Sequence, residues 1–224
     1  IGRIYPLFGA VLLIMAGAIL VSLLFSDIKM PELTFANLHP AELPIWPLLM
    51  ITISCGAISG FHSTQSPIIS RTLKKETEGR KVFYGAMIGE GVIALIWCAA
   101  GMSFYGGTAE LSSVVSAVGA GGVVDEIAIG LLGTVGGFLA VLSVIILPIT
   151  TGDTSLRSAR MIVLDFLGSR IKGNQTTVAI LATVAVTIPA FYLSTIDYQF
   201  LWRYVGMTNQ MVATVMLWVA TSYL

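Results

Sequence analysis

The sequence predicts an all-α membrane protein with about six transmembrane helices, at least one of them interrupted. The 224 residues are 56% hydrophobic and only 11% charged, whereas a soluble domain carries about 25% charged residues. Long apolar stretches also recur along the whole chain. A bilayer core of roughly 30 Å takes about 20 apolar residues in a helix, so several of these stretches are long enough to cross it.

Six stretches meet that length, and we treat them as one transmembrane domain. They lie at about 4–25, 44–61, 82–105, 127–150, 177–195 and 201–224. The chain begins at Ile1 and ends in an apolar run at Leu224. We therefore expect an internal segment of a longer protein, whose remaining helices would be partners of these six.

The charged residues predict the topology. Lysine and arginine are concentrated between the second and third stretches (62–81) and between the fourth and fifth (151–176). The connections at 26–43 and 106–126 have no such excess. Because cytoplasmic loops are enriched in basic residues, the first pair should be cytoplasmic and the second pair external. This pattern is typical of a multi-pass protein of a bacterial or archaeal inner membrane.

Two connections have structure-forming patterns of their own. Residues 108–122 are rich in Gly, Ser and Ala and could form a short surface helix or a re-entrant piece. Residues 152–172 combine the apolar side chains of Leu156 and 161–164 with three arginines and two aspartates, which fits an amphipathic helix lying along the cytoplasmic face. A solvated helical loop is the alternative for that second connection.

Composition and motifs exclude several classes of function. The net charge is zero, which gives nucleic acid no basic surface to bind. Cys55 and Cys98 have no metal-ligand spacing around them, and no nucleophile elbow, phosphate loop or zinc-protease motif occurs. We expect no enzyme activity, no cofactor and no metal site.

The most informative polar stretch follows the second apolar segment. It contains the candidate substrate-binding residues His62, Ser63, Thr64, Gln65 and Ser66. Pro67 and the nearby glycines disfavour a continuous helix. In transporters, a helix broken at membrane depth exposes backbone groups that bind solutes and ions. The alternative is a helix that simply ends at the cytoplasmic surface with polar caps.

Glu90 is the main candidate for proton coupling. It lies eight residues into its apolar stretch, roughly 12 Å deep at 1.5 Å per residue. A carboxyl group at that depth is costly and is by default a functional candidate. The alternative is a structural glutamate paired with His62, Gln65 or another helix.

A second candidate coupling site follows the fourth apolar stretch. Asp153 lies beside the hydroxyls of Thr150, Thr151 and Thr154, which could surround a cation. An aspartate before Thr-Ser is also a good N-cap for a following helix.

The last apolar stretch contains two amides, Asn209 and Gln210, below the aromatic and basic residues at its start. They could line a substrate pathway, or they could form hydrogen bonds between helices.

Four blocks together resemble the carbon starvation protein A family: SGFHSTQSP, GRKVFYGAMIGEGVIALIW, PITTGDTSLRSAR and WRYVGMTNQ. The resemblance covers about Gly56 to Trp218. It implies a longer inner-membrane carrier, linked to pyruvate and peptide uptake, with a leucine-transporter-like broken-helix bundle. One departure is Val205 and Met207, where the family leads us to expect aromatic residues. If that block touches substrate, the preferred substrate differs.

The resulting hypothesis is a secondary active transporter, coupled to H⁺ rather than Na⁺, for pyruvate, a similar small carboxylate or short peptides. The first alternative is sodium-coupled amino-acid uptake with Asp153 at the cation site. The alternative from another class is a nutrient-sensing or scaffold membrane protein without flux.

Overall fold

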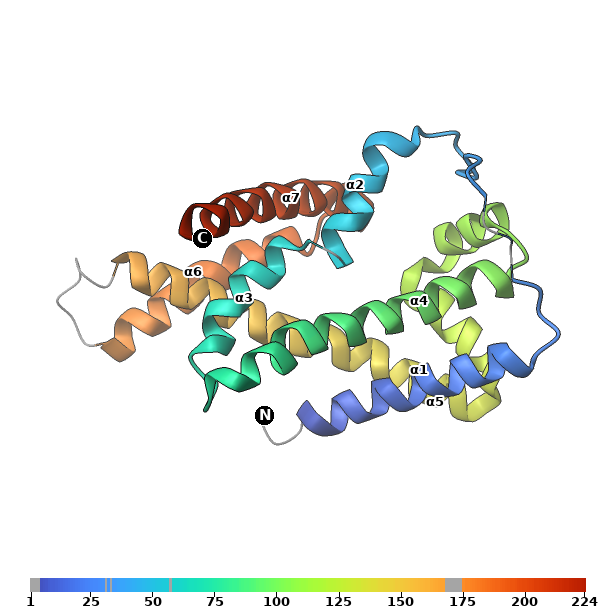
Figure 1. Cartoon of the computed structure of the whole chain (residues 1–224), viewed down its shortest axis with the longest axis horizontal. Helices are drawn as coiled ribbons and strands as arrows, with labels where there is room; N and C mark the ends of the chain where they lie inside the picture. Colours follow the sequence, from blue (N-terminus) through green and yellow to red (C-terminus); the bar gives the residue numbers. More distant parts are fainter. Residues whose placement is uncertain (1–4, 31, 33, 57, 168–174) are drawn as a thin grey trace. The chain divides into compact units, whose positions relative to one another are not determined.

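The computed structural model describes residues 5–30, 32, 34–56, 58–167 and 175–224, all of them in helices or connecting segments. The chain, drawn in Figure 1, divides into two compact units. The first comprises Ile1–Leu48 and Ala86–Thr150, and the second comprises Leu49–Gly85 and Thr151–Leu224.

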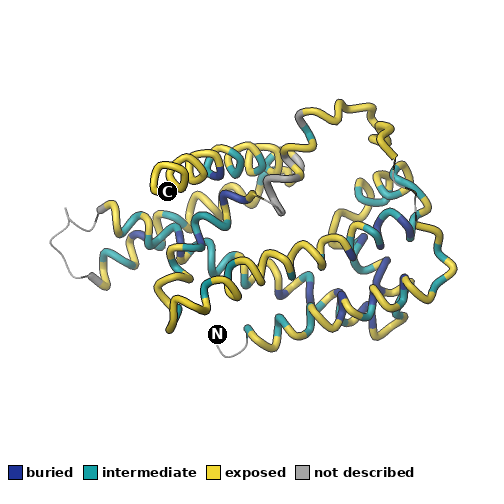
Figure 2. The backbone as a smooth tube through the Cα atoms, in the orientation of Figure 1, coloured by how far each residue is buried: buried dark blue, intermediate teal, exposed yellow. Residues whose placement is uncertain are grey.

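The first unit is built from α1 (Tyr5–Phe25), α4 (Ala86–Phe104) and the larger part of α5 (Thr108–Leu167). Its core is an apolar cluster in which Met15, Ile19 and Ile127 are at most 2% exposed. Alanines at 100, 128 and 140 are completely buried; their small side chains suit closely packed helices. In Figure 2 the buried residues are dark blue, both in this core and in the second unit.

Helix α5 is three helical pieces joined by two glycines. Gly119 (φ 73°, ψ 170°) and Gly133 (φ 66°, ψ −155°) interrupt it, both in a backbone region that is essentially restricted to glycine. The pieces therefore cover 108–118, 120–132 and 134–167.

The piece 120–132 folds back along the first part of the piece 134–167, as far as Val144. A Cβ atom added at Gly137 would lie 2.6 Å from Ile129 Cγ1, and one at Gly121 would lie 3.5 Å from Val144 Cγ1. These pairs are roughly symmetric about Gly133, so the two pieces are an antiparallel hairpin with its tip there. The piece 108–118 also packs back on α4, across the turn at Gly106: a Cβ atom added at Gly101 would lie 3.7 Å from Leu111 Cδ2. Residues 108–122 are therefore helical on both sides of Gly119 and pack within this unit. The choice between a surface helix and a re-entrant piece stays a prediction.

The second unit contains α2 (Ile45–Gly56, most of which belongs here), α3 (Gly60–Ser70), η1 (Glu76–Glu78), the π-helical turn η2 (Arg80–Gly85), the end of α5, α6 (Gln175–Leu193) and α7 (Tyr198–Tyr223). Helix α3 packs on α7. Helix α3 also runs parallel to the end of α5, since each of two contacts between them joins residues that are 94 positions apart in the chain. Ser158 Oγ donates to the Thr64 carbonyl at 3.2 Å, and Arg71 lies 3.7 Å from Asp165.

Four helical segments of the described chain are long and apolar enough to cross a membrane: Tyr5–Phe25, Glu76–Phe104, Thr108–Phe166 and Thr176–Leu193. They correspond to four of the six predicted spans. The other two predicted spans do not meet this criterion. Helix α2 has only 12 residues, and α7 carries polar side chains along much of its length. The all-α membrane class is confirmed.

Candidate functional site

A break between two helices is the centre of the candidate site in the second unit. Helix α2 ends at Gly56 and α3 begins at Gly60, with Ser59 as its N-cap. Ser59 Oγ accepts a hydrogen bond from the Phe61 N–H at 3.2 Å. The interruption therefore lies at the start of the polar stretch, beginning at Ser59, in which it was predicted. His62 to Ser66 are themselves helical, and Pro67 lies within α3 rather than ending it.

Asn209 of α7 closes the start of α3. Its Oδ1 accepts a second hydrogen bond from the Phe61 N–H at 2.8 Å and lies 3.4 Å from Ser59 Oγ. The first N–H groups of a helix have no partner inside it and carry positive partial charge. The side-chain amide of Asn209 thus occupies the position that a solute oxygen could take. Its pairing with α3 agrees with the interhelical hydrogen bonding that we gave as one alternative.

Gly60 makes this approach possible. A Cβ atom there would meet the Asn209 carbonyl oxygen and would lie 2.8 Å from Val212 Cβ. Contacts that close do not occur between real side chains, so α3 and α7 can come together here only through a residue without a side chain.

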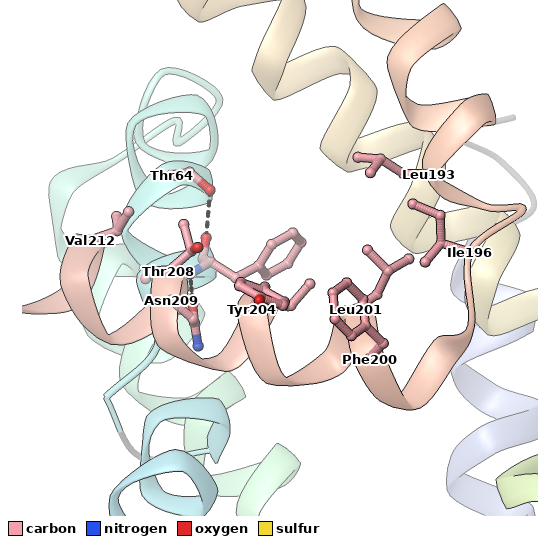
Figure 3. A pocket seen from close by; sticks show the side chains of 12 residues that line it. Thr64, Leu193, Ile196, Phe200, Leu201, Tyr204, Thr208, Asn209 and Val212 are labelled. Carbon is pink, nitrogen blue, oxygen red and sulfur yellow. Dashed lines mark hydrogen bonds between the residues drawn. The ribbon is translucent and has the colours of Figure 1, made fainter.

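An open groove of about 610 Å³ lies against the same contact (Figure 3). Phe61 and Thr64 of α3 line it together with Tyr204, Thr208 and Asn209 of α7, and the remaining walls are mostly apolar. Apolar walls with a few placed polar groups are typical of small-molecule sites. Gln210, which we also predicted to bind substrate, is not among the residues that line this groove.

The polar side chains of α3 are engaged to different degrees. The hydroxyls of Ser63, Thr64 and Ser66 donate to backbone carbonyls of their own helix at 2.6 to 2.8 Å. Their oxygens can still accept hydrogen bonds. Gln65 is 6% exposed, and neither of its side-chain polar atoms has a hydrogen-bond partner among the described residues.

Glu90 belongs to the first unit. It lines a cavity of about 640 Å³ between α1, α4 and α5, with Met15, Trp97 and Ser143 among the other lining residues. The other lining residues are apolar except Ser143, and Glu90 is the one charged residue among them. Its role as proton carrier stays a prediction.

Asp153 does not begin a helix. Helix α5 continues through Thr150, Thr151 and Thr154 without a break, so the expectation that a helix ends there is wrong. The Pro148 ring is accommodated inside α5, and Asp153 Oδ2 instead accepts a hydrogen bond from Arg157 Nη2 at 2.9 Å, one turn further on. This pairing replaces the predicted N-cap.

Sequence reasoning placed Ser59 and Gly60 at the start of the polar stretch, but it did not give them the roles of N-cap and helix contact that the structure shows. It missed the position of two acidic residues. Asp125 and Glu126 were placed in an external connection, whereas the structure places them on the folded-back piece of α5. Glycine recurs along this part of the chain, so the sequence did not single out the two positions, 119 and 133, where the helix turns.

Comparison with known proteins decides the family. The sequence model of the family described as carbon starvation protein CstA matches residues 5–110 and 102–224. The chain belongs to the CstA family. This agrees with the resemblance of the four sequence blocks, and it identifies a membrane protein.

Several relatives of this CstA-family chain are known by name. An uncharacterized membrane protein of Haemophilus influenzae is 46% identical over 136 residues, which is 52% of this chain and 37% of that protein. The pyruvate/proton symporter BtsT of Escherichia coli is 38% identical over 76 residues, 31% of this chain and 10% of BtsT. The peptide transporter CstA of Helicobacter pylori is 45% identical over 53 residues, 23% of this chain and 8% of that protein.

The aligned parts thus cover just over a third of the first of these relatives and about a tenth or less of the two named transporters. No solved structure matches the chain.

Proposed function

We propose that this CstA-family protein is a secondary active transporter that takes up a small carboxylate such as pyruvate, or short peptides, together with protons. The observation that carries the proposal is the start of α3, where Asn209 Oδ1 holds the Phe61 N–H at 2.8 Å beside the groove. A carboxylate oxygen is a stronger acceptor for such an N–H than a neutral amide. Substrate can therefore replace Asn209 at the helix start.

The relatives' names support this class of function. One is named a pyruvate/proton symporter and others are named peptide transporters. Both pyruvate and a peptide carry a carboxylate, so one oxygen-binding helix start would serve either kind of substrate.

The proton is favoured over sodium by the contacts of Asp153. A carboxylate that already accepts from the Arg157 guanidinium at 2.9 Å has part of its charge neutralised, which makes it a poorer ligand for a cation. In our proposal Glu90 carries or gates the proton, and the threonines around Asp153 serve the helix rather than an ion.

Substrate protection tests the site. A cysteine at Thr64, which lines the groove, should react with a small soluble thiol reagent in the intact protein, and pyruvate or a short peptide should slow that reaction. A cysteine at Thr214, whose hydroxyl bonds the Gln210 carbonyl outside the groove, is the matched control and should show no protection. Equal rates at Thr64→Cys with and without every substrate tested would remove the groove from the proposal.

A further inference from the structure

The connection from α3 to α4 contains a basic loop, residues 73–83, which includes η1 and the first part of η2. Two basic pairs lie in it, Lys74–Lys75 and Arg80–Lys81. A Cβ atom added at Gly79 would lie 3.9 Å from Leu73 Cδ1 and 3.9 Å from Phe83 Cδ2. Both ends of the basic loop therefore fold against the same point, which places one basic pair beside the other.

The charges of these two pairs are available to an external anion. All four side chains are exposed. Among the described residues, none of them forms an ion pair, although Glu76 and Glu78 lie in the same loop. Arg71, just before the loop, differs because it lies 3.7 Å from Asp165. Unpaired cations gathered on one small surface create a local positive potential that attracts anions.

The surroundings of the basic loop indicate which kind of anion it meets. The loop leads into the apolar part of the candidate span Glu76–Phe104, where the side chains of Val82 and Tyr84 are 36% and 59% exposed. Tyrosine is enriched at the level of the lipid headgroups, and four or more Lys and Arg residues beside a span are typical of sites for anionic lipids. A soluble polyanion would leave Val82 and Tyr84 without a partner. A phospholipid offers a phosphate to the cations and apolar chains to these two neighbours.

The folded shape of the basic loop goes beyond what membrane topology requires. The positive-inside rule depends on the number of basic residues in a connection, and an extended loop with the same residues would satisfy it equally well. Here the contacts of Leu73 and Phe83 at Gly79 bring the two basic pairs together. Such an arrangement suits the binding of one phosphate group by several cations.

We propose that the basic loop binds the headgroup of an anionic phospholipid, with its two basic pairs around the phosphate and with Val82 and Tyr84 against the apolar chains. The site is independent of the proposed transport function, because the residues that line the groove and the Glu90 cavity do not include any residue of the basic loop.

Native mass spectrometry of the intact protein in detergent tests the site. Phosphatidylglycerol and phosphatidylcholine with the same acyl chains are added in equal amounts, and the lipids that stay bound are counted. Replacement of the four cations by glutamine should remove about one phosphatidylglycerol per chain and leave the bound phosphatidylcholine unchanged. Lys29→Gln and Arg203→Gln, which remove exposed cations outside the basic loop, are the controls and should retain the parental number.

A second variant is needed because the four cations also orient the protein in the membrane. Glu76→Gln combined with Glu78→Gln keeps every cation and raises the net positive charge of the basic loop. It should retain more phosphatidylglycerol than the parent and should release it only at a higher salt concentration. Parental retention in either variant would overturn the proposal. Displacement of the bound lipid by inorganic phosphate at a similar concentration would also overturn it, because free phosphate has no apolar chain for Val82 and Tyr84 to contact.

Discussion

Phe61 and Asn209 are 148 positions apart in the chain, yet the backbone N–H of Phe61 donates to the side-chain oxygen of Asn209 at 2.8 Å. This bond joins the start of α3 to the middle of α7, at the position where Gly60 lets the two helices touch. It links the two polar segments that the sequence indicates as substrate sites.

Asn209→Leu should destabilise the protein and impair uptake. The substitution removes the shorter of the two hydrogen bonds of the Phe61 N–H and leaves only the one to Ser59 Oγ, and a lost cap bond costs about 0.5–2 kcal/mol. Asn209→Asp keeps the acceptor and adds a negative charge that favours a helix start, so it should retain stability. Thermal unfolding of the intact protein in detergent measures this, with Thr214→Val as the control on the same helix. Equal melting temperatures for Asn209→Leu and the control would show that the bond contributes little.

Glu90→Gln separates coupling from packing. The glutamine keeps the shape of the side chain but cannot release a proton. If Glu90 carries the proton, uphill uptake driven by a proton gradient should be lost while substrate exchange persists. If Glu90 is a structural partner, both activities should fall together or both should remain. Parental accumulation in Glu90→Gln would remove Glu90 from the mechanism.

Tyr105 predicts a pH dependence of stability. Burial, and then the hydrogen bond and charge of Glu126, raise the pKa of Tyr105 from 10.0 to about 12. The folded state therefore keeps this proton at a pH where the unfolded chain has lost it. Its contribution to stability is complete below pH 10 and is lost as pH rises toward 12. Tyr105→Phe should flatten that part of the unfolding profile, and an identical alkaline loss in both proteins would contradict the assignment.

Cysteine labelling tests the predicted topology. Cysteines at Lys75, between α3 and α4, and at Glu42, between α1 and α2, should react with an impermeant thiol reagent from opposite sides of the membrane. The reason is that the basic connection should be cytoplasmic and the acidic one external. Reaction of both from the same side would exclude the six-span arrangement.

Much of the fold could be predicted from composition and periodicity, because lipid as solvent demands long apolar helices. The interruption near residue 60 was also predictable, since Gly, Ser and Pro are concentrated there. The hairpin at Gly133 was not, because a positive φ depends on contacts that bring 120–132 back along 134–147, and the apolar pattern is the same either way. For the same reason Asp125 was taken for a loop residue.

The pairings within the site also escape sequence reasoning. Asn209 and Phe61 meet only because α3 and α7 pack together, which no local pattern shows. Asp153 is the opposite case, since an Asp-Thr-Ser sequence fits an N-cap and a helix interior alike. The Arg157 one turn further on was the signal in favour of the interior.

The most direct test of the central claim is uptake by the purified intact protein in proteoliposomes, with imposed proton and sodium gradients applied separately. Labelled pyruvate and short peptides would form the panel, with an amino acid as the comparison. The proposed function predicts uphill accumulation of pyruvate or a peptide with an inward proton gradient alone, abolished by a proton ionophore. Accumulation that requires sodium, or no flux of any substrate under either gradient, would contradict it.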